Sequence, residues 1–190
     1  MGWIILYSSL IWNYIIFKIN KVQYQQFPKV YGRINVRGRS GCLKIGSNVT
    51  INSNKWLNPV GLSSNTYICL SPKAEIIIGN HVGLSNCLLF ARERIIIEDH
   101  VKIGGGCQIL DNDFHSLDYR IRKTDQDQNN VMSKVIIIRN GAFIGTGSII
   151  LKGVEIGENS IVGAGSVVTK PIPAFEVWAG NPARFIKRLD

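Results

Sequence analysis

The chain has 190 residues, which fits a single domain, and its 22 basic against 13 acidic side chains give a formal net charge of +9. The four cysteines, Cys42, Cys69, Cys87 and Cys107, form no C-x-x-C pair, so their spacing excludes the common zinc motifs and predicts reduced thiols in a cytoplasmic protein. No stacking or base-reading motif accompanies the positive charge, and nucleic-acid binding is therefore not expected.

The positive charge is concentrated in the first part of the chain. Residues 1–74 contain nine Lys and Arg side chains and no Asp or Glu, whereas residues 75–190 contain 13 of each sign. A segment with basic and no acidic side chains could bind an anionic surface. The alternative interpretation is that these side chains form a solvated face that binds no partner.

Residues 1–30 are expected to form an apolar helix followed by a basic linker. Large apolar side chains recur at three- and four-residue spacing, which is typical of a helix. They are Trp3, Tyr7, Leu10, Tyr14 and Phe17. Because further aliphatic residues leave little polar surface, something must cover this helix. It either caps the following domain or packs between subunits, or it lies on the inner face of a membrane, where the lysines after it would meet acidic lipid. The run is too short for a confident membrane span and lacks the features of a signal peptide.

A six-residue period dominates residues 31–173. Aliphatic residues recur every six positions, and each is followed four places later by a small or aliphatic residue. The first series is Ile138, Ile144, Ile150, Ile156, Val162 and Val168, and the second is Ala142, Ser148, Val154, Ser160, Ser166 and Ile172. Neither the 3.6-residue period of a helix nor the two-residue period of a strand gives this pattern. It predicts short strands joined by turns, with three units in each 18-residue coil of a triangular parallel β-helix.

The period is less regular earlier in the chain. It is visible at Ile45 and again at Ile78, where Val82, Leu84 and Leu88 continue it, and it slips by one residue before Ile97. Glycine often follows the aliphatic residue, as at Gly145, Gly157 and Gly163, and we expect these glycines to relieve tight backbone dihedrals at the corners. General crossover preferences favour a right-handed turn.

Residues 111–134 break the period completely. They are polar and contain no aliphatic repeat, and the hexads resume in phase after them. A long excursion from a repeat is either a disordered insert or a functional loop.

The C-terminal part resembles a known family. The segment I-G-E-N-S-I-V-G-A-G-S-V-V-T-K at 156–170, followed by P-I-P and by A-G-N-P-A-R at 179–184, resembles the hexapeptide-repeat acyltransferases, closest to the sugar O-acetyltransferase and xenobiotic acetyltransferase branch. The resemblance covers most of residues 76–190. It implies an all-β fold, a left-handed parallel β-helix at residues 31–173 with a protruding active-site loop at 111–134 and a C-terminal segment at 174–190. It further implies a homotrimer with active sites in the clefts between adjacent prisms.

The resemblance also implies a catalytic histidine near the start of the loop. In D-N-D-F-H-S at 111–116 this is His115. An imidazole can remove the proton of a sugar hydroxyl as the oxygen attacks a thioester, and a backbone amide can stabilise the oxyanion. Asp111, Asp113 and Asp118 are the candidates for orienting the imidazole, and Asp113 is included in the predicted catalytic site. Some relatives carry a second histidine or a glutamate next to the first, where this chain has Ser116.

Acetyl-CoA is the donor that the resemblance implies, with no metal required. Small residues would line the pantetheine arm at Thr146, Gly147, Ala164 and Gly165. The matching positions near the nucleotide phosphates are Thr169, Lys170, Arg184 and Lys187, since mobile ammonium groups and a guanidinium suit phosphate oxygens.

The function implied is acetyl transfer to a sugar hydroxyl during surface polysaccharide or capsule assembly. N-acetylation of an amino sugar and acetylation of an antibiotic are close variants. A non-catalytic binding scaffold and a zinc-dependent β-helix hydratase are the other classes, and the hydratase needs three converging histidines. His81, His100 and His115 are the three available, and surface turn positions are the expected role of the first two.

Overall fold

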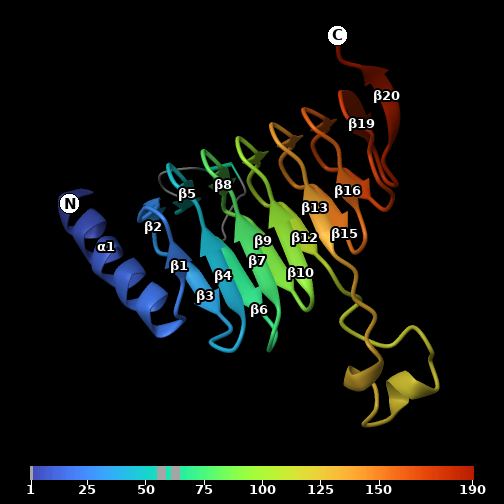
Figure 1. The fold of residues 1–190 in the computed structure, drawn as a ribbon, viewed down its shortest axis with the longest axis horizontal. Coiled ribbons are helices and arrows are strands. Elements are labelled where there is room, and N and C mark those ends of the chain that lie inside the picture. The colour runs from blue at the N-terminus through green and yellow to red at the C-terminus, as the bar shows by residue number, and fades with distance from the viewer. Residues whose placement is uncertain (1, 55–58, 61–64) are drawn as a thin grey trace.

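The computed structural model describes residues 2–54, 59–60 and 65–190, and it describes the side chains of the N-terminal helix from Ser9 onward. Figure 1 shows one stack of coils, with the helix α1 (Gly2–Ile19) at one end and the last two strands at the other. Two of the predicted helix side chains, Trp3 and Tyr7, lie outside the described side chains.

The described strands form three sheets, one on each side of the prism. Sheet A contains Gln23–Tyr24 (β1), Cys42–Ile45 (β4), Glu75–Ile78 (β7), Arg94–Ile97 (β10), Ile136–Ile138 (β13) and Glu155–Ile156 (β16). Sheet B contains Lys29–Gly32 (β2), Thr50–Ser53 (β5), Gly83–Ser85 (β8), Lys102–Ile103 (β11), Phe143–Ile144 (β14), Ile161–Val162 (β17), Glu176–Ala179 (β19) and Arg184–Arg188 (β20). Sheet C contains Asn35–Arg37 (β3), Tyr67–Leu70 (β6), Leu88–Ala91 (β9), Gln108–Leu110 (β12), Ile149–Leu151 (β15) and Val167–Val168 (β18).

The sheets are parallel, apart from the antiparallel pair formed by β19 and β20. In the last coils each strand pairs with the strand 18 residues later, as in Ile138 with Ile156, Ile144 with Val162 and Ile150 with Val168. These registers confirm the predicted three-hexad coil. In Figure 1 the strands of sheet A run upward on the near side and the chain returns on the far side while it advances toward the C-terminus, which is a left-handed winding. The fold is a left-handed parallel β-helix, so the general preference for right-handed crossovers does not hold here.

The core is the interior of the prism, and the hexad residues fill it. The six aliphatic residues of the first series are at most 1% exposed, and those of the second series at most 2%. Cys107 is buried as expected, and burial raises the pKa of the neighbouring Cys87 thiol to about 12. All four cysteines are free thiols.

The glycines that follow the aliphatic residues are needed for a reason other than the expected one. A Cβ placed on Gly145 would lie 2.5 Å from the backbone nitrogen of Ala164, and one on Gly157 would lie 2.3 Å from that of Ala174. These positions have no positive φ; the positive φ values fall elsewhere, for example at His81, His100 and Asn159. The glycines therefore permit the close approach of successive coils and do not relieve left-handed backbone.

The slip in the repeat has a local cause. Ile97 lies eight positions after the buried Leu89, whereas Ile156 lies six positions after Ile150, because the turn at Arg92–Arg94 is longer. The Asp111 carboxylate accepts hydrogen bonds from all three backbone amides of this turn, at 2.7–2.9 Å. The prediction that Leu88 points inward is wrong: Leu88 points outward, and its neighbours Cys87 and Leu89 are buried in the core.

The helix α1 covers the N-terminal end of the stack through an unusually polar face. Asn13 is fully buried, donates from Nδ2 to the Gly32 carbonyl at 2.9 Å, and accepts at Oδ1 from the Ile34 amide at 3.1 Å. Among the helix side chains that the structure describes, Phe17 enters the core and Ile16 packs partly against it, whereas the predicted stripe residues Leu10 and Tyr14 are exposed to solvent. No helix in the described part of the chain is long and apolar enough to cross a membrane.

Candidate active site

His115 lies on the loop that leaves the stack after β12 and returns at β13. The loop contains two short 3₁₀ helices, η1 (Ile121–Lys123) and η2 (Gln128–Asn130), and projects from the edge where sheet C meets sheet A (Figure 1). Its first turn packs back on the stack, since the rings of Phe114 and Phe90 meet edge to face at 4.8 Å. This contact holds the backbone of His115 beside the outer surface of sheet C.

The imidazole of His115 is paired with a carboxylate from farther along the same loop. Nδ1 of His115 lies 2.6 Å from Oδ2 of Asp127, which also accepts a 2.7 Å hydrogen bond from the Ser116 amide at Oδ1. The hydrogen bond from His115, followed by that from Ser116, lowers the pKa of Asp127. The Asp127 side chain is 14% exposed and the imidazole 63% exposed, so the second ring nitrogen can face a solvent-borne substrate.

The structure corrects the predicted partner of the imidazole. Asp113 forms an ion pair with Lys152, with 2.6 Å between Oδ1 and Nζ, and only its backbone carbonyl contacts His115, through the amide. Asp111 is occupied by the turn at Arg92–Arg94, and Asp118 pairs with Arg120. The three expected aspartates therefore have structural partners, and Asp127 takes the position they were expected to fill.

These aspartates and their partners fix the loop on the prism. Lys152 belongs to the next coil, so its ion pair with Asp113 ties the base of the loop to the stack. Within the loop, the Arg122 guanidinium donates to the Ser116 carbonyl at 2.9 Å. Arg92, in the turn of the stack that precedes β10, donates to the Gln128 carbonyl of the loop. A polar insert without a core is thus held by charge-assisted hydrogen bonds at both ends.

The residues predicted to line a pantetheine arm gather at a different edge, where sheet B meets sheet C. Thr146 and Gly147 follow β14, and Ala164 and Gly165 follow β17, one coil later. All four are exposed, and a Cβ built on Gly165 would meet no atom within 4 Å. The stacked small residues leave an open strip in which a ligand can approach the backbone closely.

The predicted phosphate-binding residues are divided between two edges. Arg184 pairs with Ala179 in the terminal hairpin and lies near the strip, and Lys187 lies farther along the same strand. Thr169 and Lys170 follow β18, at the opposite end of the sheet C strands. Each of these four side chains is exposed.

Sheet C therefore separates the two halves of the predicted site. His115 follows the C-terminal end of β12, whereas Thr146 precedes the N-terminal end of β15, and these strands are parallel neighbours in register. The five steps along the chain from Thr146 to Leu151 span roughly 16 Å at about 3.3 Å each. Within one chain the imidazole and the strip of small residues face different edges of the prism.

His81 and His100 occupy the corner between sheets A and B, as surface turn residues. Both are exposed with positive φ, and their rings stack in parallel with centroids 4.8 Å apart. Among the described residues, no group of three or more His, Cys, Asp or Glu side chains is placed to hold a metal ion.

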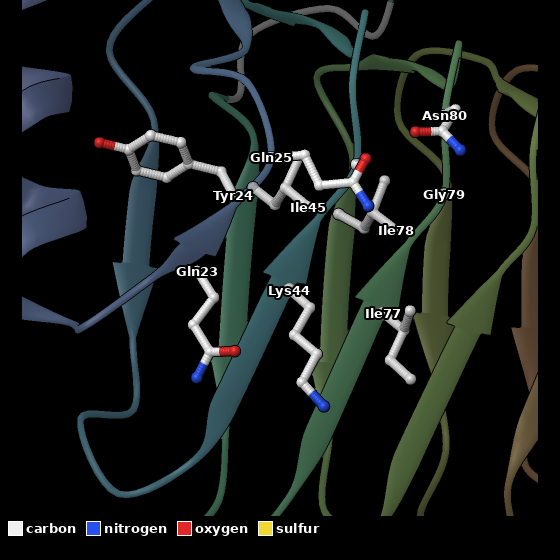
Figure 2. A pocket seen from close by; sticks show the side chains of 10 residues that line it. Gln23, Tyr24, Gln25, Lys44, Ile45, Ile77, Ile78, Gly79 and Asn80 are labelled. Atoms are coloured by element: carbon white, nitrogen blue, oxygen red, sulfur yellow. The ribbon is translucent and has the colours of Figure 1, made fainter.

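A hollow of about 390 Å³ lies on the outer face of sheet A in the first coils (Figure 2). Figure 2 shows Gln23 and Lys44 along this face, with Ile77 on the neighbouring strand. The lining contains Lys, Tyr, Gln and Asn but no histidine and no carboxylate, so it offers no general base near neutral pH.

Two residues of the candidate site were not anticipated from the sequence. Asp127 lies 12 residues after His115 in a segment without periodicity, and the only signal for it is that the loop carries several carboxylates. Lys152 occupies an outward corner of an ordinary hexad, where a lysine is unremarkable. Both contacts depend on how the loop folds back on the stack.

Comparison with known proteins supports the fold and the repeat. Residues 136–170 match the family model described as bacterial transferase hexapeptide (six repeats). The galactoside O-acetyltransferase of Escherichia coli is 32% identical over 142 residues, which cover 74% of this chain and 64% of that enzyme. This chain spans less than two thirds of the length of the curated relatives it matches.

Two solved structures share the fold over most of their length. A hexapeptide-repeat containing-acetyltransferase from Vibrio cholerae has a TM-score of 0.60 at 24% identity, with 96% of this chain and 81% of that chain covered. A mutant N-acyltransferase from Bacillus cereus, in complex with dTDP and coenzyme A, has a TM-score of 0.66 at 24% identity, with 89% and 83% covered. The chain thus carries the hexapeptide repeat of bacterial transferases on the fold of the hexapeptide-repeat acetyltransferases.

Proposed function

We propose that this protein is an acetyltransferase that moves the acetyl group of acetyl-CoA to a sugar hydroxyl, in surface polysaccharide or capsule biosynthesis, with His115 as general base. The observation that carries the proposal is the pair formed by His115 and Asp127 on an exposed loop. The similarity to a galactoside O-acetyltransferase supports the choice of a sugar hydroxyl.

The pair suits proton transfer. The Asp127 carboxylate accepts the hydrogen bond from Nδ1–H of His115, so the neutral imidazole keeps its proton on Nδ1 and presents Nε2 as the proton acceptor. Nε2 takes the hydroxyl proton while the sugar oxygen attacks the thioester carbonyl carbon, and the imidazolium then protonates the sulfur when the carbon–sulfur bond breaks. The negative carboxylate stabilises the imidazolium that forms between these steps.

The proposed donor site is the strip at Thr146, Gly147, Ala164 and Gly165. Acetyl-CoA supplies an activated acyl thioester when it is bound. The open space over Gly147 and Gly165 suits a narrow chain lying against backbone, and Thr169, Lys170, Arg184 and Lys187 are the proposed contacts near the phosphates.

A homotrimer would unite the two halves of the site. The outward positions of sheet C from β6 onward are uncharged and mostly apolar, namely Tyr67, Cys69, Leu88, Phe90, Gln108, Leu110, Ile149, Leu151 and Val167. Sheet A instead carries ion pairs of Glu75 with Lys44 and Arg94. If sheet C faces the threefold axis, the loop edge of one subunit meets the strip edge of the next, and His115 then faces the donor site of a neighbour.

The test is acceptor-dependent release of free CoA from acetyl-CoA across hydroxyl sugars, amino sugars and nucleotide sugars. Loss of a general base should slow release by about 10²- to 10⁴-fold in His115→Ala. The exposed His100→Ala, outside the loop, is the matched control and should keep full activity. Release that persists in His115→Ala would remove the residue from this role.

The same geometry suits transfer to an amino sugar, and the N-acyltransferase neighbour favours it as the second candidate. An amine acceptor that outperforms every hydroxyl acceptor would select this alternative. Absence of acetyl-CoA binding would instead favour a non-catalytic scaffold.

A further inference from the structure

The outward face of α1 is apolar, the reverse of the arrangement expected for a helix on the surface of a water-soluble prism. The inward stripe contains the polar residues Ser9, Asn13 and Asn20, which are at most 7% exposed. The outward face contains Leu10, Ile11, Tyr14, Ile15 and Ile19, which are 41–63% exposed. Trp12 lies at its margin, where the indole donates a hydrogen bond to the Ile34 carbonyl at 3.1 Å. A water-facing surface helix normally shows the opposite polarity, so this face is expected to be covered.

Basic side chains surround this face. Lys18 lies on the face itself, with Nζ 5.6 Å from the centre of the Tyr14 ring, and the Arg33 guanidinium lies 5.6 Å from the Trp12 ring. Lys18 and Lys21 also line a hollow of about 500 Å³ at the C-terminal end of the helix, beside Tyr24. Residues 1–74 contain no acidic side chain that would neutralise them.

We infer that this helix face binds the surface of an anionic lipid bilayer, with the helix lying in the interface. Aliphatic and aromatic side chains would enter the boundary between headgroups and acyl chains, while Lys18 and Lys21 contact lipid phosphates. The helix is not long and apolar enough to cross the bilayer, which agrees with an interfacial position. A second copy of the same face is disfavoured, because it would bring Lys18, Lys21 and Arg33 against their own counterparts without any acidic partner. This inference does not depend on the proposed acetyl transfer.

The experiment is sedimentation of the full chain with vesicles of phosphatidylcholine, with and without phosphatidylglycerol. We expect binding to the anionic vesicles that weakens with salt. The double substitution Ile11→Glu and Ile15→Glu places charge on the inserted face and should reduce binding by about tenfold or more. Ile186→Glu alters an equally exposed isoleucine, 58% exposed, at the other end of the stack and should leave binding unchanged.

A charge-matched pair tests the electrostatic part. Lys18→Gln should reduce binding by about fivefold, whereas Arg188→Gln, with the same net charge, should not. Each substituted side chain is exposed, so the fold should survive, and circular dichroism would confirm this. Absence of binding to anionic vesicles, or equal binding by the double glutamate variant, would overturn the inference. A self-associated form in sedimentation velocity that the double variant disperses would assign the face to a second copy instead.

Discussion

At the scale of single residues, the loop carboxylates have two roles: some anchor the loop to the stack, and one contacts the imidazole of His115. Asp111 accepts hydrogen bonds from the backbone of the turn at Arg92–Arg94, and Asp113 forms an ion pair with Lys152. Both contacts hold the base of the loop to the stack. Asp127 alone meets the imidazole of His115. The sequence predicted that a carboxylate would serve the histidine, but a polar segment without periodicity offers no way to choose among five aspartates.

Replacing Asp127 should separate positioning from binding. We expect Asp127→Asn to lower kcat by about 10- to 100-fold through loss of imidazole orientation and charge, with KM for acetyl-CoA little changed. Asp125→Asn removes the same charge from an exposed position of the same loop and is the control. An equal loss in both variants would point to net loop charge as the cause.

The lowered pKa of Asp127 gives this contact a definite pH dependence. A carboxylate whose folded pKa lies below its ordinary 3.8 stabilises the fold above that value, and the stabilisation disappears as pH falls through the folded pKa. Proteolytic cleavage of the loop in the wild type should therefore stay constant from neutral pH down to about 4 and rise only below it. In Asp127→Asn, cleavage should be faster over the whole range, since no carboxylate is present to protonate.

At the scale of elements, the hexad strands could be predicted from the sequence. For the helix, its position in the chain could be predicted but its orientation could not. Periodicity identified the inward residues of the last coils because an aliphatic side chain recurs at the same place in each six-residue unit, and these side chains are buried. It could not orient α1, where apolar residues occupy almost every side. The orientation is set by Asn13, whose amide completes the hydrogen bonding of the first coil in place of a strand.

Removing this amide should loosen the helix. Asn13→Ala leaves the Gly32 carbonyl and the Ile34 amide buried without partners, and we expect a loss of about 1–3 kcal/mol in the free energy of unfolding. Urea denaturation measures the loss, and hydrogen exchange should show it concentrated in α1 and β2. Ile11→Ala, at an exposed position of the same helix, should change stability by less than about 0.5 kcal/mol. A stable Asn13→Ala variant would show that the Asn13 amide is not needed to dock the helix.

At the scale of the whole molecule, the six-residue repeat predicted the 18-residue coil, and the family resemblance predicted that the coils wind in a left-handed sense. General chain chirality favoured the wrong hand, because that preference describes crossovers through helices more than tight coils. The division of the candidate site between two edges was not visible in the sequence. It follows from which end of each sheet C strand a residue occupies, and this is known only once the register is known.

The proposed trimer can be tested through sheet C. Leu151→Glu places a charge in its outward apolar column and should convert the trimer to monomers, with loss of acceptor-dependent CoA release, because the two halves of the site would no longer meet. Sedimentation equilibrium measures the mass. Ile96→Glu makes the same exchange on the outward side of sheet A and should leave the trimer intact. Dissociation by Ile96→Glu alone would place the interface on sheet A.

The loop that bears His115 leaves the stack without interrupting it. Ile95, Ile96 and Ile97 of β10 pair directly with Ile136, Ile137 and Ile138 of β13, as though the residues between β12 and β13 were absent. Selection can therefore lengthen, shorten or rewrite this segment while the scaffold beneath it keeps the same hydrogen bonds. Under the proposed function, a gene for such a protein can diverge toward new acceptors through changes in this loop, provided that the anchoring carboxylates at its base are retained.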